Sequence, residues 1–258
     1  MRLLLFLFLV ISSTMFAQTP TERFTQAYEI SRQNLRTDPA RAREFGELAL
    51  EAAREADNDS LRILALTACG NSRTKTDSLG AADYLGRALS LALNYPSRYL
   101  RAVAHNNLGI FHKTYDNYPA AATEYHAAIA LNEAADRVDL LADNYQNLAA
   151  ILDLSKQRAN ALAYLKKALQ LDSTRVTDEQ RSRIWNSKGI VHCQEGELGR
   201  GITALKRALS YLPADARYQR ANTLNNIALA HQLREEHIMA VRYNDRATLL
   251  ANELRDTS

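Results

Sequence analysis

Histidine, cysteine and asparagine residues recur at regular places along the chain, and each type could support a different chemistry. Adjacent asparagines at 106–107 and at 225–226 offer hydrogen-bond donors and acceptors to a partner. The histidines and cysteines could instead hold a metal ion, transfer protons or form a disulfide. These residues are His112, His192, His231, Cys69 and Cys193. The elements that position them decide which of these chemistries is possible.

The sequence signatures of common catalytic sites are absent. There is no H-E-x-x-H metalloprotease motif, no G-x-S-x-G nucleophile motif and no phosphate-binding loop. The glycine-rich stretch GELGRG at 196–201 lacks the spacing of a dinucleotide-binding fingerprint and is typical of a turn between helices. We therefore expect a protein that is not an enzyme and that carries no cofactor.

Small residues recur with a fixed rhythm that divides the chain into repeats. In each copy, a small residue is followed 12 residues later by a second one and 7 residues after that by alanine. The copies begin at Cys69, Gly109, Ala149, Gly189 and Ala228. These starting residues are 40, 40, 40 and 39 positions apart, and a weaker first copy keeps only Ala42 and Ala49. The sequence therefore predicts six repeats.

Each repeat has the pattern of two helices joined by a short turn. In the third repeat, apolar and small residues recur every three or four positions along the first helix, and Pro119 suits the first turn of the second. The segments Thr19–Glu22 and Thr177–Gln180 have the sequence of capping boxes, which begin helices. The small residues let the paired helices approach to about 8–10 Å. The repeats are expected at about 20–56, 59–95, 99–135, 138–173, 177–213 and 216–254.

This pattern resembles the tetratricopeptide repeat (TPR) family of helical-repeat proteins. The resemblance covers about residues 20–256 and rests on Leu108, Gly109, Tyr118, Ala121, Tyr125 and Ala128 in the third repeat and on Trp185, Gly189, Gly196, Gly201, Ala208 and Pro213 in the fifth. The chain departs from the family in its longer repeat, since about 34 residues is usual. It also departs in Lys188, which stands where an apolar residue is expected. The resemblance implies an all-α solenoid, a right-handed superhelix of helix pairs whose first helices line a concave groove for peptides or proteins.

The repeat geometry argues against a metal site and against a disulfide. The three histidines occupy one place in different repeats, at least about 8–10 Å apart, whereas each nitrogen on a zinc ion lies about 2 Å from it. We therefore expect core histidines and no metal. Cys69 and Cys193 are three repeats apart, beyond the limit of about 7 Å between Cα atoms for a disulfide. Both should be free thiols.

Polar amides recur on the side of the first helices that faces away from the helix-pair core. A helix that turns by about 100° per residue places Asn107 almost opposite Gly109 and His112. A carboxamide donates and accepts, which matches the backbone of an extended peptide, and the family resemblance implies the same use. The alternatives are hydrogen bonds between neighbouring repeats, or neither role. The candidate groove residues, including three cations that would favour an acidic partner, are Asn106, Asn107, Lys113, Gln146, Asn147, Asn186, Ser187, Asn225, Asn226, Arg73 and Arg183.

The first 17 residues have the layout of a secretory signal peptide. Arg2 precedes an apolar run from Leu3 to Ile11, and a short segment leads to Ala17, after which we expect cleavage. This segment is too short to span a membrane, so we expect an exported solenoid domain at 18–258, periplasmic or secreted, without stable membrane insertion. The net charge of +3, from 32 basic and 29 acidic residues, indicates a mixed surface and no nucleic-acid partner.

The sequence as a whole predicts a non-catalytic exported scaffold that binds a protein or peptide partner in its groove. The alternative is the sensor or input region of a bacterial signalling system. Such a region would be detached from a histidine kinase or transcription regulator, or would act on one in trans.

Overall fold

The computed structural model describes residues 18–255, and this part of the chain consists of twelve α-helices with short connections and no strand. The predicted all-α class is confirmed, and the predicted signal peptide lies outside the described residues. The helices are α2 (Pro20–Asn34), α3 (Pro39–Glu55), α4 (Asp59–Arg73), α5 (Ser78–Leu93), α6 (Arg98–Thr114), α7 (Tyr118–Glu133), α8 (Val138–Leu154), α9 (Arg158–Gln170), α10 (Asp178–Gln194), α11 (Leu198–Ser210), α12 (Arg217–Leu233) and α13 (His237–Arg255).

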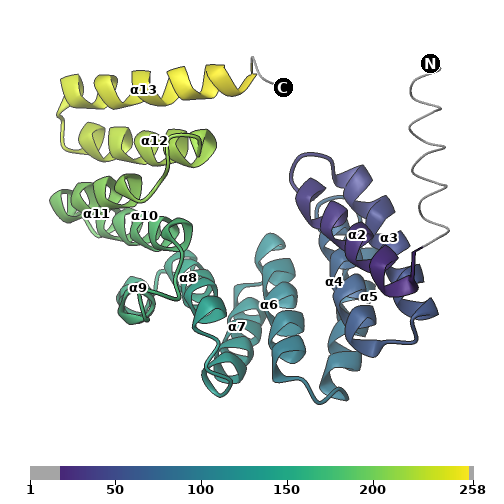
Figure 1. Cartoon of the computed structure of the whole chain (residues 1–258). Coiled ribbons are helices and arrows are strands. Elements are labelled where there is room, and N and C mark those ends of the chain that lie inside the picture. The colour runs from purple at the N-terminus through teal and green to yellow at the C-terminus, as the bar shows by residue number, and fades with distance from the viewer. Residues whose placement is uncertain (1–17, 256–258) are drawn as a thin grey trace, which may run out of the picture. The chain divides into compact units, whose positions relative to one another are not determined.

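The helices pack in sequence order within two compact units, one ending at Leu131 and the other beginning at Asn132. In the first unit α2 packs on α3 and α4 on α5, and the packing continues from α3 to α4 and from α5 to α6. In the second unit α8 packs on α9, α10 on α11 and α12 on α13 (Figure 1). The first helices of neighbouring repeats also contact each other, α4 with α2 and α6, and α10 with α8 and α12. Packing between neighbours in sequence is the pattern of a helical-repeat array.

Both predicted capping boxes begin helices. At α2, the Glu22 N–H donates to Thr19 Oγ1 (3.3 Å) and the Thr19 N–H donates to the Glu22 carboxylate (2.7 Å). At α10, Thr177 and Gln180 form the same reciprocal pair. The Gln180 Nε2 also donates to the backbone carbonyl of Asp139 (2.7 Å), one repeat earlier. The second capping box therefore ties α10 to α8 as well as starting the helix.

The turn between the two helices of a repeat uses a left-handed residue at one fixed place. In the third to sixth repeats this residue comes seven positions after the first small residue, at Asp116 (φ 55°), Lys156 (φ 63°), Gly196 (φ 78°) and Glu235 (φ 61°). Glycine adopts this conformation without strain. The glycine-rich stretch at 196–201 is therefore the turn and start of a helix, as its sequence predicted.

The core of each helix pair is built on the small residues of the repeat rhythm. With the exception of the half-buried Ala240, they are buried; they include Ala42, Ala49, Cys69, Ala81, Ala88, Gly109, Ala121, Ala128, Ala149, Ala161, Ala168, Gly189, Gly201, Ala208, Ala228 and Ala247. A Cβ atom built on Gly109 would lie 2.8 Å from Cε1 of Tyr125, whose side chain is fully buried. The small residues thus leave room for the larger side chains of the facing helix.

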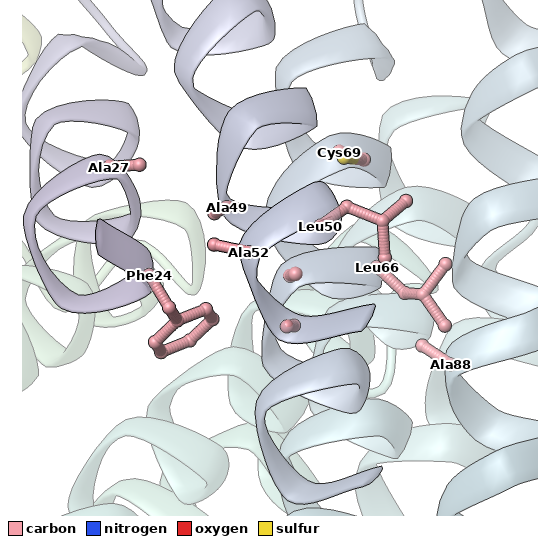
Figure 2. Close-up of a cluster of buried hydrophobic side chains, with 10 residues drawn as sticks. Phe24, Ala27, Ala49, Leu50, Ala52, Leu66, Cys69 and Ala88 are labelled. Carbon is pink, nitrogen blue, oxygen red and sulfur yellow. The ribbon is translucent and has the colours of Figure 1, made fainter. Parts of the chain in front are cut away.

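Larger side chains join successive helices around these contacts. In the first unit, Phe24 of α2, Leu50 of α3 and Leu66 of α4 belong to one buried cluster with Cys69 and several alanines (Figure 2). In the second unit, Ile202, Leu205, Ile227 and Ala230 form a corresponding cluster between α11 and α12. No helix among the described residues is both long and apolar enough to cross a membrane.

Candidate functional site

In the first unit, the candidate residue Asn107 takes part in a hydrogen bond between repeats. Asn107 Nδ2 donates to the Val103 carbonyl within α6 (2.8 Å), and Asn107 Oδ1 accepts from Nδ2 of Asn71 on α4 (2.8 Å). Both asparagines are half-buried. Asn71 was not among the predicted residues, although it is an amide on the first helix of its repeat and 36 residues from Asn107. This amide pair joins α4 to α6.

In the second unit, the structure brings candidate residues of neighbouring repeats together in pairs. Gln146 Nε2 on α8 donates to Ser187 Oγ on α10 (3.2 Å), and Asn226 Nδ2 on α12 donates to Asn186 Oδ1 on α10 (3.1 Å). In each hydrogen bond, the first of the two adjacent candidate residues in one repeat (Gln146 or Asn186) contacts the second of the two in the next repeat (Ser187 or Asn226). One of the two predicted roles, bonding between repeats, is therefore present at these positions. A carboxamide has two N–H donors and an oxygen with two acceptor sites, so these bonds leave capacity for a partner.

The remaining amides differ in exposure. Asn106 and Asn147 are half-buried, and Asn225 is exposed beside Leu229 in a hollow between α12 and α13. These positions remain predictions for partner binding.

The predicted groove cations are largely engaged inside the fold. Arg73 has a side chain that is 11% exposed and forms an ion pair with Glu47, and its guanidinium lies 4.7 Å from the centroid of the Tyr84 ring. Arg183 forms ion pairs with Asp143 of the preceding repeat and with Glu179 of its own helix. Each arginine already faces a carboxylate, so neither adds uncompensated positive charge. Lys113 is half-buried, and burial lowers the pKa of its ammonium group.

A hollow lies beside the amide pair of the first unit. It has a volume of about 310 Å³ and is built by the first helices α2, α4 and α6, together with Leu35 directly after α2. Its lining residues are Tyr28, Ser31, Arg32, Leu35, Thr67, Ala68, Asn71, Val103 and Asn107. The amides of the pair are therefore part of the wall of an open concavity.

A second hollow lies beside the Asn186–Asn226 pair in the second unit, mainly between α10 and α12. Its volume is about 180 Å³, and it is lined by Ile190, Cys193, Gln194, Leu205, Asn226, Leu229, Ala230 and Leu233. Leu229 and Leu233 remain 54% and 57% exposed. We call these eight lining residues the leucine groove. The groove combines solvent-exposed apolar side chains with an amide that can orient a bound partner, and this is the usual composition of a binding site.

Two of the three histidines at the equivalent place, His192 and His231, contact a glutamate of their own repeat. His192 Nδ1 lies 2.6 Å from Oε2 of Glu197, and His231 Nδ1 lies 2.5 Å from Oε2 of Glu236. His231 is buried, as predicted for a core histidine, while His112 and His192 are half-buried. Each histidine–glutamate contact links the end of a first helix to the turn that follows. Within residues 18–255, no group of three or more His, Cys, Asp or Glu side chains is placed to hold a metal ion, and both cysteines are free thiols.

The arrangement of helix pairs is shared with several solved structures. The apo form of RapI superposes with a TM-score of 0.72 at 15% sequence identity, covering 96% of this chain and 90% of RapI. A kinesin light chain of Podosopora anserina with nearly identical TPR-like repeats superposes with a TM-score of 0.62 at 12% identity, covering 77% of this chain and 98% of that one. The chain has the TPR-like repeat fold. No protein-family model matches its sequence, and no curated protein matches it.

A further structure with this TPR-like fold contains a bound factor. It is a Rap protein complexed with Competence and Sporulation Factor, with a TM-score of 0.71 and 14% identity, covering 95% of this chain and 67% of that one. At identities this low, the similarity concerns the fold alone.

Proposed function

We propose that this chain is a non-catalytic, exported scaffold that binds a protein or peptide partner along the first helices of its repeats. The observation that carries the proposal is the leucine groove, where Leu229 and Leu233 stay half-exposed beside Asn226. Solvent-exposed leucines next to an amide in the lining of one hollow give a partner both apolar area to bury and a polar group to orient it.

The two kinds of residue would contribute differently to binding. Burying a leucine side chain fully is worth about 1.5–3 kcal/mol, and roughly half of each groove leucine is still available for a partner to cover. The amides that join the repeats are already hydrogen-bonded within the fold, so their additional hydrogen bonds would set the register of the bound segment. The Rap complex supports this role, because it shows a protein of the same fold holding a factor.

A substitution in the leucine groove tests the proposal. Peptides would be selected from a random phage-displayed library on the purified full chain, and their affinity would be measured by fluorescence anisotropy. Leu229→Glu should weaken binding by at least about tenfold, because a partner would have to cover a carboxylate with apolar side chains. The matched control is Leu249→Glu on α13, since Leu249 is 61% exposed and does not line the groove. Selected peptides that bind both variants as tightly as the unmodified chain would refute the proposal.

Export is supported by the signal-peptide pattern of the first 17 residues. It is tested by sequencing the N-terminus of protein recovered from the cell envelope. A first residue of Gln18 supports periplasmic or secreted localisation, and a retained Met1 opposes it.

A signalling input region is the second candidate, and the Rap complex is the observation that favours it, because the bound molecule there is a factor. The same groove would then receive the signal. Sequencing the DNA beyond codon 258 separates the two candidates, since an in-frame membrane helix followed by a kinase domain would identify a sensor.

A further inference from the structure

A further pocket lies between the fourth and fifth repeats, on a different side of α10 from the leucine groove. It has a volume of about 570 Å³ and is formed by α9, α10 and α11, and its lining residues are Leu162, Lys166, Trp185, Lys188, His192, Gly199, Arg200, Thr203 and Ala204. We call it the tryptophan pocket. Trp185, Lys188 and His192 follow each other at three- and four-residue spacing and share one side of α10. Ile190 and Gln194 belong to the leucine groove and lie on the opposite side of the helix.

Lys188 holds a position that the other repeats fill with apolar residues. It immediately precedes the small residue Gly189, and the corresponding residues are Ala68, Leu108, Leu148 and Ile227. Leu148 and Ile227 are fully buried. Lys188 is half-buried, and burial together with the nearby charges of Arg207 and Lys166 lowers the pKa of its ammonium group. Lys188 therefore places a positive charge at a position that is apolar in the other repeats, close to the positive charges of Arg207 and Lys166.

The two lysines of this pocket have no ion-pair partner among the described residues. None of the nine lining residues is Asp or Glu. The Glu197 carboxylate lies 2.7 Å from Arg200 and 2.6 Å from His192. No ion pair involves Lys166, Lys188 or Arg207 in the part of the chain that the structure describes. The Lys188 ammonium lies 4.9 Å and the Arg207 guanidinium 4.5 Å from the ring of Trp185. The aromatic ring compensates these cations only in part, because a cation–π contact at an exposed site is worth about 0.5–1 kcal/mol.

We propose that the tryptophan pocket docks an acidic segment of a partner protein, whose carboxylates pair with Lys188 and Lys166 beside Trp185. Charge complementarity selects this occupant, because α9 and α10 each place a lysine without an ion pair, Lys166 and Lys188, in the wall of one open hollow. A carboxylate placed there would compensate lysines that the fold itself leaves without an ion pair, and the packing of the two helices that carry them would restrict where each carboxylate lies. The site is distinct from the leucine groove, so it goes beyond the proposed function.

The chain contains a single tryptophan, so tryptophan fluorescence reports on the surroundings of Trp185, which lines this pocket. The full chain would be titrated with a hexaglutamate peptide, and parallel titrations would use citrate, inorganic phosphate and hexalysine. We expect a saturable fluorescence change with hexaglutamate and none with hexalysine. Absence of a change with hexaglutamate would overturn the proposal. Citrate or phosphate binding as tightly as the peptide would also overturn it, because the pocket would then be a small-anion site.

Lys188→Leu is the decisive variant, because it restores the residue type of the other repeats. It should weaken hexaglutamate binding by roughly five- to tenfold while raising the melting temperature, since a half-buried charge is replaced by an apolar side chain. Lys188→Gln, which keeps a polar side chain of similar length, should show the same loss of affinity. The control Lys75→Gln removes one exposed charge in the first unit and should leave binding unchanged. Equal losses in the Lys188 and Lys75 variants would show that only net charge matters and would refute the site.

The result is independent of the leucine groove. If Leu229→Glu leaves hexaglutamate binding intact while Lys188→Leu weakens it as expected, the two sites are separate. If Leu229→Glu alone abolishes it, the acidic segment binds in the groove and the tryptophan pocket is not its site.

Discussion

The close approach of α10 and α11 makes a specific prediction about Gly201. A Cβ atom built on Gly201 would lie 2.9 Å from the carbonyl oxygen of Gly189, 3.2 Å from the backbone nitrogen of Cys193 and 2.2 Å from its Sγ. The sulfur can move by rotation of its side chain, but the two backbone atoms belong to the facing helix and can move only with it. Gly201→Ala should therefore push the two helices apart.

The magnitude follows from two opposing terms. Alanine is favoured over glycine in a helix by about 0.8–1 kcal/mol, whereas inserting a methyl group into a packed contact costs about 1–3 kcal/mol. Two of the three short contacts are with backbone, so we expect the upper part of the second range. The net result should be a destabilisation of about 1–2 kcal/mol, or a fall of about 2–4 °C in Tm for each kcal/mol in a chain of this size.

The matched control is Gly86→Ala in α5, where the same methyl group meets nothing within 4 Å. There only the helix-propensity term remains, so stability should rise by about 1 kcal/mol. Urea unfolding followed by far-UV circular dichroism measures both variants, and transition midpoints are compared because repeat arrays need not unfold in a single step. A Gly201→Ala variant as stable as the unmodified chain, or a change of the same sign in both variants, would refute the close packing of α10 on α11.

Two further predictions concern the thiols and the amide pairs. Cys69 is fully buried, and burial raises the pKa of its thiol to about 12. At about pH 8, near the usual thiol pKa, Ellman's reagent should therefore label the half-buried Cys193 well before Cys69. Equal labelling rates for the two thiols would contradict the burial of Cys69. Because its pKa is raised, Cys69 should begin to react only as the pH approaches that value. A double-mutant cycle on Asn186→Ala and Asn226→Ala should give an interaction energy of about 0.5–1.5 kcal/mol, and an energy near zero would show that the two amides are not bonded in solution.

The fold was predictable because small residues at fixed spacing have a geometric cause that the sequence displays directly. Gly189 and Gly201 are 12 positions apart because that spacing brings two positions of a helix hairpin face to face, and the structure places their backbones in contact. The capping boxes at Thr19 and Thr177 were predictable for the same reason, since both partners lie within three residues of each other. Both the close contact of paired helices and the capping boxes depend on residues within one repeat, so they can be predicted without knowing the neighbouring repeats.

The partners of the polar side chains were less predictable, because they depend on the register between repeats. Helical periodicity placed Asn107 on the side away from the helix-pair core, but it did not show that Asn71 of the preceding repeat would reach it. Likewise, Arg73 is on a first helix, yet its side chain bends toward Glu47 of the previous repeat. Long side chains can turn to either side of a helix, so the choice between groove and core depends on neighbours about 26–40 residues away in sequence.

The bonded amides change what should determine affinity in the proposed groove. A partner that displaced the Asn186–Asn226 hydrogen bond would have to replace it, so the net gain from that exchange would be small. A partner that covered Leu229 and Leu233 would remove exposed apolar surface without breaking any existing contact. Binding to the leucine groove should therefore be more sensitive to Leu229→Glu than to Asn226→Ala, although the amide substitution should be the more harmful to stability. The opposite order would mean that the amide of Asn226, and not the exposed leucines, provides most of the binding energy.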